Sequence, residues 1–206
     1  MKVLMINGSP HKDGNTALAL GEMEKVFAGQ GIEVEILNIG DKAIRGCMAC
    51  YACAQKGECV IDDAVNEAAA KLADADGLVV ASPVYYASAN GTLVSFLDRL
   101  FYSSKCDKRM KVGAAIAVAR RGGCSATFDE LNKYFTISNM PVAPSQYWNS
   151  VHGRFPGEAA KDEEGMQTMR TLAKNMIFMM KSFALGKEQF GLPEKEEKAM
   201  RTSFIR

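Results

Sequence analysis

The first 37 residues constrain the fold most strongly, because they alternate between two hydrophobic periodicities. Residues 2–6, "KVLMI", form a short apolar run typical of a buried strand. In residues 15–31, apolar side chains recur at roughly helical spacing, and Gly31 suits the C-terminal end of a helix. A second strand is predicted at residues 32–37. Strand, helix and strand in succession predict a βαβ unit, whose crossover implies a parallel sheet.

The same alternation continues along the chain. Apolar runs predict further strands at residues 77–82 and 111–119, the first of them ended by Pro83. A last strand is predicted at residues 140–147, where two prolines place it near a sheet edge. Helical spacing predicts helices at residues 62–76, 92–104, 125–135 and 166–185. About five strands alternating with five helices predict a doubly wound α/β sheet in one domain, residues 1–185, followed by a charged tail, residues 186–206.

Composition narrows the class of protein. With 48% hydrophobic content in 206 residues, the chain can bury the core of one compact domain. Its 25 basic and 24 acidic residues give a formal net charge of +1, which argues against a nucleic-acid or acidic-lipid binder. No apolar run approaches the roughly 20 residues of a membrane span, and the N-terminal residues lack the apolar stretch of a signal peptide. We therefore expect a cytoplasmic protein that binds neither nucleic acid nor membrane.

In doubly wound sheets, ligands bind beyond the carboxyl ends of the strands, so the loops there are the candidate site. The loop after the first strand, "NGSPHKDGNTA", combines turn-forming glycines with the hydroxyls of Ser9 and Thr16. Asn15 is the expected N-cap of the following helix, whose free amides would hold a phosphate. The loop matches neither the dinucleotide nor the triphosphate glycine motif, and an ordinary βα turn remains the alternative.

Two further loops carry unusual residues. "SPVYYASANG", residues 82–91, places Tyr85 and Tyr86 among small residues, which suits a flat aromatic ligand, although the pair could simply pack on the sheet edge. "ARRGG", residues 119–123, puts Arg120 and Arg121 before two glycines. Glycines let a backbone approach a ligand closely, while guanidinium groups balance its negative charge. The alternative is a solvent-exposed turn that binds no ligand.

Four of the six cysteines form a C-x2-C-x2-C-x5-C motif: Cys47, Cys50, Cys53 and Cys59. In a reducing compartment, clustered cysteines are more often metal ligands or catalytic thiols than disulfides. Compact spacing of the first three suits one face of a [4Fe–4S] cluster, and Gly57 can turn the chain back toward the fourth. Zinc, a thiol loop without metal, and a disulfide formed on oxidation remain alternatives. Cys106 and Cys124 lie outside the motif and are expected to be ordinary small apolar residues.

Taken together and in this order, these motifs resemble the flavodoxin-like NADPH-dependent FMN reductase family and, within it, the iron–sulfur flavoproteins. The resemblance extends from residue 1 to about residue 185. It rests on "NGSPHKDGNTA", the cysteine motif, "ADGLVVASPVYYASANGTLVSFLDR" and "ARRGG", and it includes "VHG", residues 151–153, with the acidic "DEEG", residues 162–165, before the last helix. It implies a flavodoxin-like five-stranded parallel sheet in the order 2-1-3-4-5, with a cysteine-rich loop, residues 43–62, after the second strand.

The resemblance also implies the cofactors and their residues. The FMN phosphate would be held by Ser9, Asn15, Thr16 and the amide of Ala17, with His11 where relatives often carry arginine. The isoalloxazine ring would lie against Pro83, Val84, Tyr85 and Tyr86, and against Ala119, Arg120, Arg121, Gly122 and Gly123. A [4Fe–4S] cluster would be bound by Cys47, Cys50, Cys53 and Cys59. NAD(P)H or a ferredoxin-type protein would be the electron donor, and a homodimer or homotetramer is expected.

The prediction is an electron-transfer flavoenzyme that passes electrons between a reduced donor, FMN and a [4Fe–4S] cluster. Two alternatives stay open: a cluster-free NAD(P)H-dependent FMN or quinone reductase, and a non-enzymatic redox sensor built on thiols or zinc. Arg120 and Arg121 would favour an anionic reduced flavin. We expect the cysteine loop to lie close to the sheet edge that binds FMN and to relay electrons across a subunit boundary.

Overall fold

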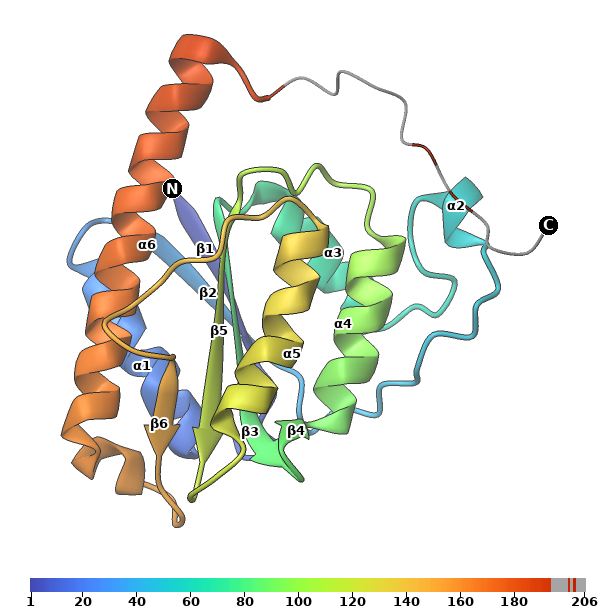
Figure 1. Ribbon diagram of the computed structural model, residues 1–206. Helices are drawn as coiled ribbons and strands as arrows, with labels where there is room; N and C mark the ends of the chain where they lie inside the picture. Colours follow the sequence, from blue (N-terminus) through green and yellow to red (C-terminus); the bar gives the residue numbers. More distant parts are fainter. Residues whose placement is uncertain (194–199, 201, 203–206) are drawn as a thin grey trace.

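One mixed sheet organises the chain, seen in the computed structural model, which describes residues 1–193, 200 and 202 (Figure 1). Five strands run parallel in the order β2 (Glu33–Asn38), β1 (Lys2–Asn7), β3 (Gly77–Tyr85), β5 (Val112–Ala119) and β6 (Ser150–His152). The short β4 (Ser88–Ala89) pairs antiparallel with the end of β3. The predicted order of the five main strands is confirmed, and the cysteines follow the second strand as expected.

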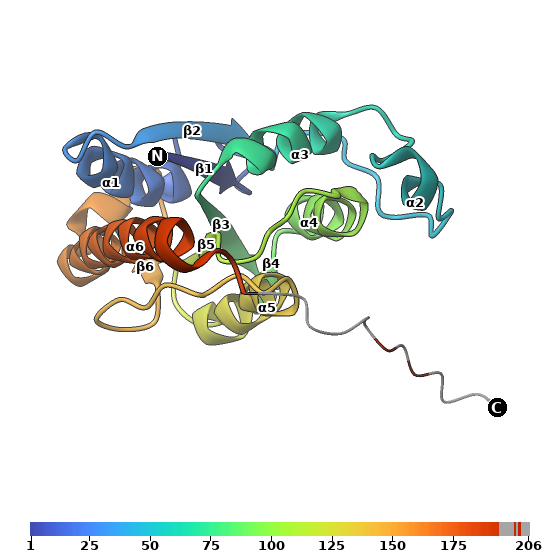
Figure 2. The ribbon, with the colours of Figure 1, turned by 90° about the horizontal axis from the view of Figure 1, so that it is seen from above.

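Helices cover both faces of this sheet, as the view from above shows (Figure 2). One face carries α1 (Asn15–Ala28) and the long α6 (Glu163–Phe190), with the 3-10 helix η1 (Glu158–Lys161) beside them. The other carries α3 (Ala64–Asp74), α4 (Gly91–Ser103) and α5 (Cys124–Ile137). The single-turn α2 (Cys53–Lys56) lies within the cysteine loop, away from the sheet.

The sheet divides the apolar core into two halves. Every residue of β5 is buried, and the inward side chains of α1 and α6 pack on one side of it. Those of α3, α4 and α5 pack on the other. Gly113 lets α5 come close, because a Cβ there would lie 2.6 Å from the ring of Phe135. Side-chain caps fix where three helices begin: Asp63, Asn90 and Asp162 each accept a hydrogen bond from the first turn that follows.

Most predicted elements are shifted by one to three residues, and three elements differ more clearly from the sequence prediction. The strand β3 continues through Pro83 to Tyr85. Pro83 lacks an N–H group, but that position faces β1, and pairing with β1 already ends at Asn7 and Ala81, so no ladder hydrogen bond is lost. The last strand is β6, not residues 140–147, where only Val142 forms a single bridge to Gly113. In the last helix, α6 begins three residues earlier than predicted and ends at Phe190 rather than residue 185.

The predicted charged tail, residues 186–206, therefore begins inside α6, and residues 194–199, 201 and 203–206 lie outside the described part of the chain. None of the described helices is both long enough and apolar enough to cross a membrane.

Candidate functional site

Three loops meet at one edge of the sheet, because β1, β3 and β5 are parallel and end there. They follow Asn7, Tyr85 and Ala119, at the lower edge of the sheet in Figure 1. The predicted FMN-binding residues belong to these loops or to the strand ends and helix start that flank them. The fold thus brings the predicted segments to one side of the molecule, at the position where sheets of this class bind ligands.

Buried polar contacts shape the loop after β1. The side chain of Asn7 donates to Asn38 Oδ1 (2.9 Å) and accepts from the amide of Ser9 (3.0 Å). Ser9 is itself buried, and its Oγ accepts from the amide of His11 (3.1 Å), while the His11 side chain is exposed. Internal hydrogen bonds therefore fix the shape of the loop, and its exposed residues are accessible to a ligand.

The start of α1 has unpaired amides. Its N-cap is Gly14, which has no capping side chain, and the amides of Asn15, Thr16 and Ala17 donate to no described residue. Free amides at the N-terminus of a 14-residue helix, with its dipole, form a ready anion site. This is the place where the sequence predicted a phosphate.

The expected N-cap role of Asn15 is wrong. Its side chain accepts from the amide of Ala159 (3.1 Å) and donates to the carbonyl of Phe155 (3.0 Å). Asn15 therefore ties the start of α1 to the segment before α6, more than a hundred residues along the chain. Sequence reasoning included "VHG" and "DEEG" of that segment in the resemblance but missed its contact with Asn15, because nothing local to Asn15 reveals a partner so distant.

The loop after β3 is a tight hairpin. Tyr86 and Ala87 connect the pair formed by Tyr85 and Ser88, and both have positive φ angles, 52° and 59°. A two-residue turn of this kind normally uses Asn-Gly, so a Tyr-Ala pair is held there against its own preference. Tyr86 is 105% exposed, and Tyr85 is also exposed. The hairpin presents an aromatic side chain at the same edge as the helix start.

The hairpin and the loop after β5 pack directly together. Gly123 has φ 93°, and a Cβ there would lie 2.8 Å from Val84 Cγ1 and 2.9 Å from Ala87 Cα. Arg120 and Arg121 are exposed on the same loop. Glu130 of α5 braces the hairpin from the other side by accepting from Ser88 Oγ and from the amide of Ala89, both at 2.8 Å. Sequence reasoning missed Glu130, which looks like any solvated helix residue.

A second group that the sequence did not predict lies beside this edge. Cys124, the first residue of α5, has its Sγ 3.9 Å from His152 Nε2, and His152 Nδ1 is 3.5 Å from the Asp162 carboxylate. Burial, with a smaller effect of the charge on Asp162, raises the pKa of the Cys124 thiol. Both effects oppose ionisation of this thiol. The expectation that Cys124 is an ordinary small residue stays a prediction.

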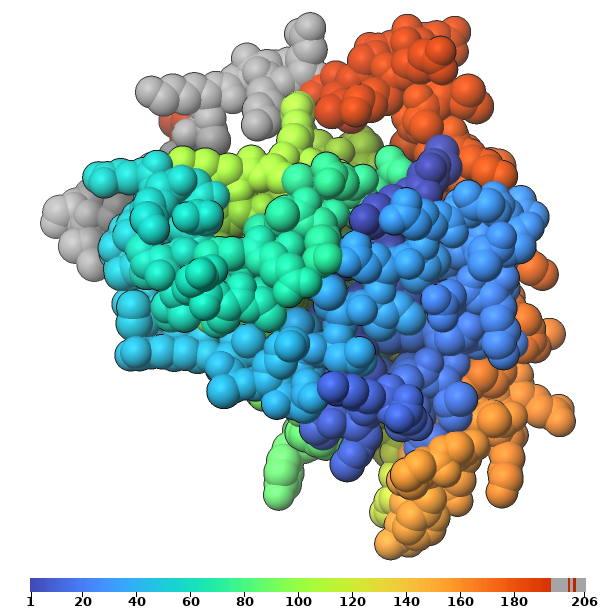
Figure 3. All heavy atoms as spheres, turned by 180° about the vertical axis from the view of Figure 1, so that it is seen from behind, coloured from blue at the N-terminus to red at the C-terminus, as the bar shows by residue number. Residues whose placement is uncertain are grey.

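The cysteine loop forms a separate pocket on the flank of the molecule. All four cysteines of the motif are free thiols, with Cys47 and Cys50 exposed and the other two half-buried. They line one almost wholly apolar pocket together with Met48, Tyr51, Val60, Ile61, Arg99, Tyr102 and Ser103. Among the described residues, no three His, Cys, Asp or Glu side chains converge tightly enough for a single ion. Seen from behind, the loop stands out at the side of the molecule (Figure 3).

The backbone of this loop has an unusual conformation. Ala49 and Tyr51, on either side of Cys50, have φ angles of 51° and 58°. The amides of residues 47–51 donate to no described residue. Left-handed residues close together in a turn occur in backbone anion sites and Fe–S sites, where free N–H groups face the ligand. The loop therefore offers four thiols beside amides that have no described partner.

The pocket lies toward the C-terminal end of α4. It contacts that half of the helix through Arg99, Tyr102 and Ser103, whereas the hairpin edge lies at the N-terminal end. Arg99 and Ser103 follow Gly91 by 8 and 12 residues, which is about 12 and 18 Å along the axis at about 1.5 Å per residue. The expected closeness of the cysteine loop to the FMN edge stays a prediction.

Comparison with known proteins identifies relatives over most of the chain. Residues 1–154 match the family model described as NADPH-dependent FMN reductase. An iron–sulfur flavoprotein of Methanocaldococcus jannaschii is 34% identical over 189 residues, covering 88% of this chain and 98% of the relative. An iron–sulfur flavoprotein of Methanosarcina thermophila is 34% identical over 181 residues, covering 85% and 93%.

Solved structures share the fold at lower identity. The NAD(P)H:acceptor oxidoreductase FerB from Paracoccus denitrificans superposes with a TM-score of 0.67 at 15% identity, over 88% of this chain and 97% of that one. An archaeal flavodoxin superposes with a TM-score of 0.60 at 14% identity, over 88% and 99%. These likenesses concern the fold alone.

Proposed function

Because the chain belongs to the NADPH-dependent FMN reductase family and is a flavin-dependent oxidoreductase, we propose that it passes electrons between a reduced donor, FMN and a [4Fe–4S] cluster. The observation that carries the proposal is the gathering of four free thiols in one apolar pocket, on a loop whose amides at residues 47–51 donate to no described residue. Relatives named iron–sulfur flavoproteins, aligned over most of the chain, support the same conclusion.

The residues at the sheet edge fit FMN. The free amides at the start of α1 and the hydroxyl of Thr16 would bind its phosphate, while Ser9 and Asn7 keep the loop in shape. The hairpin and the loop of residues 119–123 would enclose the ring, with Tyr86 available to cover it. Bound FMN would supply the chemistry, because its ring accepts a hydride or single electrons. The chain's own part is to orient the ring and exclude water.

The cysteine pocket fits a cluster better than a single ion. In a [4Fe–4S] cluster each cysteine binds a different iron, so the four sulfurs need not converge on one point. A structural zinc ion would need four ligands in a tight tetrahedron. Apolar walls and free amides are also features that tune Fe–S sites, since solvent exposure and hydrogen bonds to sulfur set their reduction potentials.

Transfer between the two cofactors would cross a subunit boundary. The thiol pocket contacts α4 at Arg99 to Ser103, about 12–18 Å along the helix from its start beside the proposed FMN edge. Head-to-tail or two-fold packing of copies could bring the exposed cysteine loop of one subunit to the FMN edge of another. The proposal therefore includes a homodimer or homotetramer, with NAD(P)H or a ferredoxin-type protein as donor.

Metal, sulfide and flavin analysis of protein purified without oxygen tests the proposal. We expect about four iron and four sulfide per subunit together with one FMN. Cys50→Ser should abolish the iron while FMN stays bound, and Cys106→Ser, outside the pocket, should keep both. Full iron occupancy in Cys50→Ser would refute the ligand assignment.

Other outcomes of the same measurement select the alternatives. Colourless protein that contains zinc and no flavin would indicate a thiol-based sensor. Bound FMN with steady NADPH turnover and no iron in wild-type protein would indicate a cluster-free reductase.

A further inference from the structure

Arg99 is the most deeply buried charged residue near the cysteine pocket. It lies on α4, is 1% exposed, and is among the largest fully buried side chains of the protein. Arginine is almost never buried without partners, because removing its charge from water is expensive unless hydrogen bonds replace the lost hydration. Its position therefore depends on what its guanidinium group touches.

The guanidinium group holds the cysteine loop from both ends. It donates to the carbonyl of Arg45 (3.2 Å), just before Cys47, and to that of Ile61 (3.0 Å), just after Cys59. Between these two anchors, Nε and Nη2 both donate to Cys59 Sγ, at 3.3 and 3.2 Å.

A single acid balances the charge of Arg99. Asp63 accepts two hydrogen bonds, from Nη1 (2.6 Å) and Nη2 (3.0 Å), in the paired geometry that arginine and carboxylate prefer. Asp63 is also the N-cap of α3, since it accepts from the amide of Val65. Arg99 is thus fixed to two helices while its remaining donors face the loop.

Cys59 is held more firmly than the other three cysteines. Asn66 of α3 accepts from the Cys59 amide (3.0 Å) and donates to its carbonyl (2.9 Å). Its sulfur carries the two bonds from Arg99. In contrast, the amides of residues 47–51 donate to no described residue, and Cys47 and Cys50 are exposed.

We propose that Arg99 is a positioning residue that presents Cys59 as the preformed fourth ligand and raises the reduction potential of the cluster. The inference rests on the proposed function. N–H donors and positive charge beside a ligating sulfur stabilise the more negative, reduced form of an Fe–S centre. Asp63 opposes this effect from the other side of the guanidinium group, so the two residues should shift the potential in opposite directions.

Potentiometry of the cluster in the absence of oxygen provides the first test. Arg99→Gln removes the positive charge and the paired N–H donors of the guanidinium group. It should lower the equilibrium constant for one-electron reduction of the cluster about tenfold, which corresponds to a fall of about 59 mV in its reduction potential. Arg99→Lys keeps the charge and should shift it less in the same direction. Asp63→Asn, which preserves the helix cap, should raise it. Unchanged potentials in all three variants would overturn the proposal.

Alkylation of the iron-free protein provides a second readout that does not need the cluster. The reaction is run at a pH high enough to ionise every thiol, so that thiolate formation no longer limits the rate. In wild-type protein, we expect Cys59 to react more slowly than Cys47, because its sulfur is half-buried and hydrogen-bonded. Arg99→Gln or Arg99→Lys should then speed Cys59 about tenfold, the scale of one charge-assisted hydrogen bond. If Cys59 reacts at the wild-type rate in a folded variant, the positioning role is refuted.

Lys111 supplies the matched control. It is a half-buried cation just before β5 that donates to the carbonyls of Ala73 and Ala75 at the end of α3. Lys111→Gln should reduce stability without changing the potential or the Cys59 rate. If the control changes both as Arg99→Gln does, the effect is only structural and the proposal fails. Wild-type protein without iron would refute the proposed function instead, and the alkylation test of Arg99 would still stand.

Discussion

At the scale of single residues, Gly40 decides how two loops pass one another. It lies just after β2, where the chain turns beneath the loop that follows β1. A Cβ on Gly40 would lie 2.3 Å from the carbonyl oxygen of Gly8 and 2.3 Å from the carbonyl carbon of Ser9. Both atoms belong to backbone, which cannot rotate away as a side chain could. Only glycine therefore permits the observed path of the proposed phosphate loop.

Substitution of Gly40 should impair FMN binding. In Gly40→Ala, the loop around Ser9 must move, so we expect FMN affinity to fall at least about tenfold and stability to fall by about 1–3 kcal/mol. Fluorescence titration with FMN and urea unfolding measure the two effects.

Gly21 in α1 is the matched control, because a Cβ there meets nothing within 4 Å. Gly21→Ala should keep FMN affinity and gain about 0.5–1 kcal/mol from helix propensity. Equal FMN affinity in the two variants would show that the loop tolerates the displacement.

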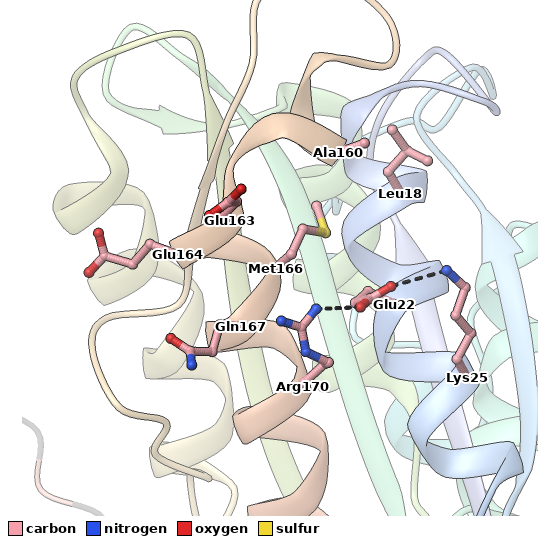
Figure 4. Close-up of a pocket in the computed structure, with 9 residues that line it drawn as sticks. All are labelled: Leu18, Glu22, Lys25, Ala160, Glu163, Glu164, Met166, Gln167 and Arg170. Atoms are coloured by element: carbon pink, nitrogen blue, oxygen red, sulfur yellow. Dashed lines mark hydrogen bonds and ion pairs between the residues drawn. The ribbon is translucent and has the colours of Figure 1, made fainter.

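At the scale of elements, α1 and α6 are joined across a surface pocket by one ion pair (Figure 4). Arg170 of α6 lies 2.6 Å from Glu22 Oε1, and Lys25, on the same helix as Glu22, lies 3.1 Å from Oε2. The hydrogen bond from Arg170, followed by that from Lys25, lowers the pKa of Glu22. The Glu22 side chain is 18% exposed, whereas Lys25 is 77% exposed, so the contact with Arg170 should matter more.

Arg170→Gln should lower the free energy of unfolding by about 0.5–1 kcal/mol at pH 7, because half-exposed pairs are screened by water. Since the pKa of Glu22 is lower in the folded chain, the pair stabilises the fold above the unfolded-state pKa of about 4.3. This contribution is lost as the pH falls through the lower, folded-state pKa.

Urea unfolding of wild type and Arg170→Gln at several pH values measures this. The difference between them should shrink below pH 4. Lys25→Gln is the control and should change stability by less at every pH. A difference that stays constant down to pH 2 would show that Arg170 acts through packing rather than through charge.

The elements also show how far sequence reasoning reached. Strands β1, β3 and β5 are continuous apolar runs, so their burial could be predicted, whereas β6 has one buried residue, Val151, and left no such signal. The three candidate loops follow the ends of parallel strands, so their common position at one sheet edge could be predicted once the fold was predicted. A charged residue such as Arg99 would ordinarily be assigned to the exposed face of α4. It lies three residues after Phe96 and four before Ser103, however, and this helical spacing places it on the same buried face as both. Its partners, Cys59 and Asp63, are brought to it only by tertiary packing.

At the scale of the whole molecule, stability and the cysteine loop are largely separate. Both halves of the core are built from the sheet and its covering helices, and residues 45–58 belong to neither. FMN, in contrast, would bind loops that come from three core strands. A ligand that binds only the folded chain stabilises it by about 2.7 kcal/mol at a concentration one hundred times its dissociation constant.

Removal of each cofactor should therefore have a different effect. Chelation of iron without oxygen should speed hydrogen exchange in residues 45–58 and leave β1, β3 and β5 protected, whereas removal of FMN should lower the Tm of the whole protein. Hydrogen exchange with mass spectrometry and calorimetry measure these effects. If iron removal deprotects the central strands, the loop and the core fold as one unit.

The hairpin that carries Tyr86 has a consequence for attempts to make this protein more heat-resistant. Left-handed geometry at two non-glycine residues costs of order 1–3 kcal/mol each, and Asn-Gly at these positions would relieve it. The same replacement would delete the aromatic ring that we propose to lie beside the flavin. At this turn, thermal stability and catalytic turnover therefore favour different residues. Selection for stability alone would replace Tyr86 and Ala87 and lower the activity.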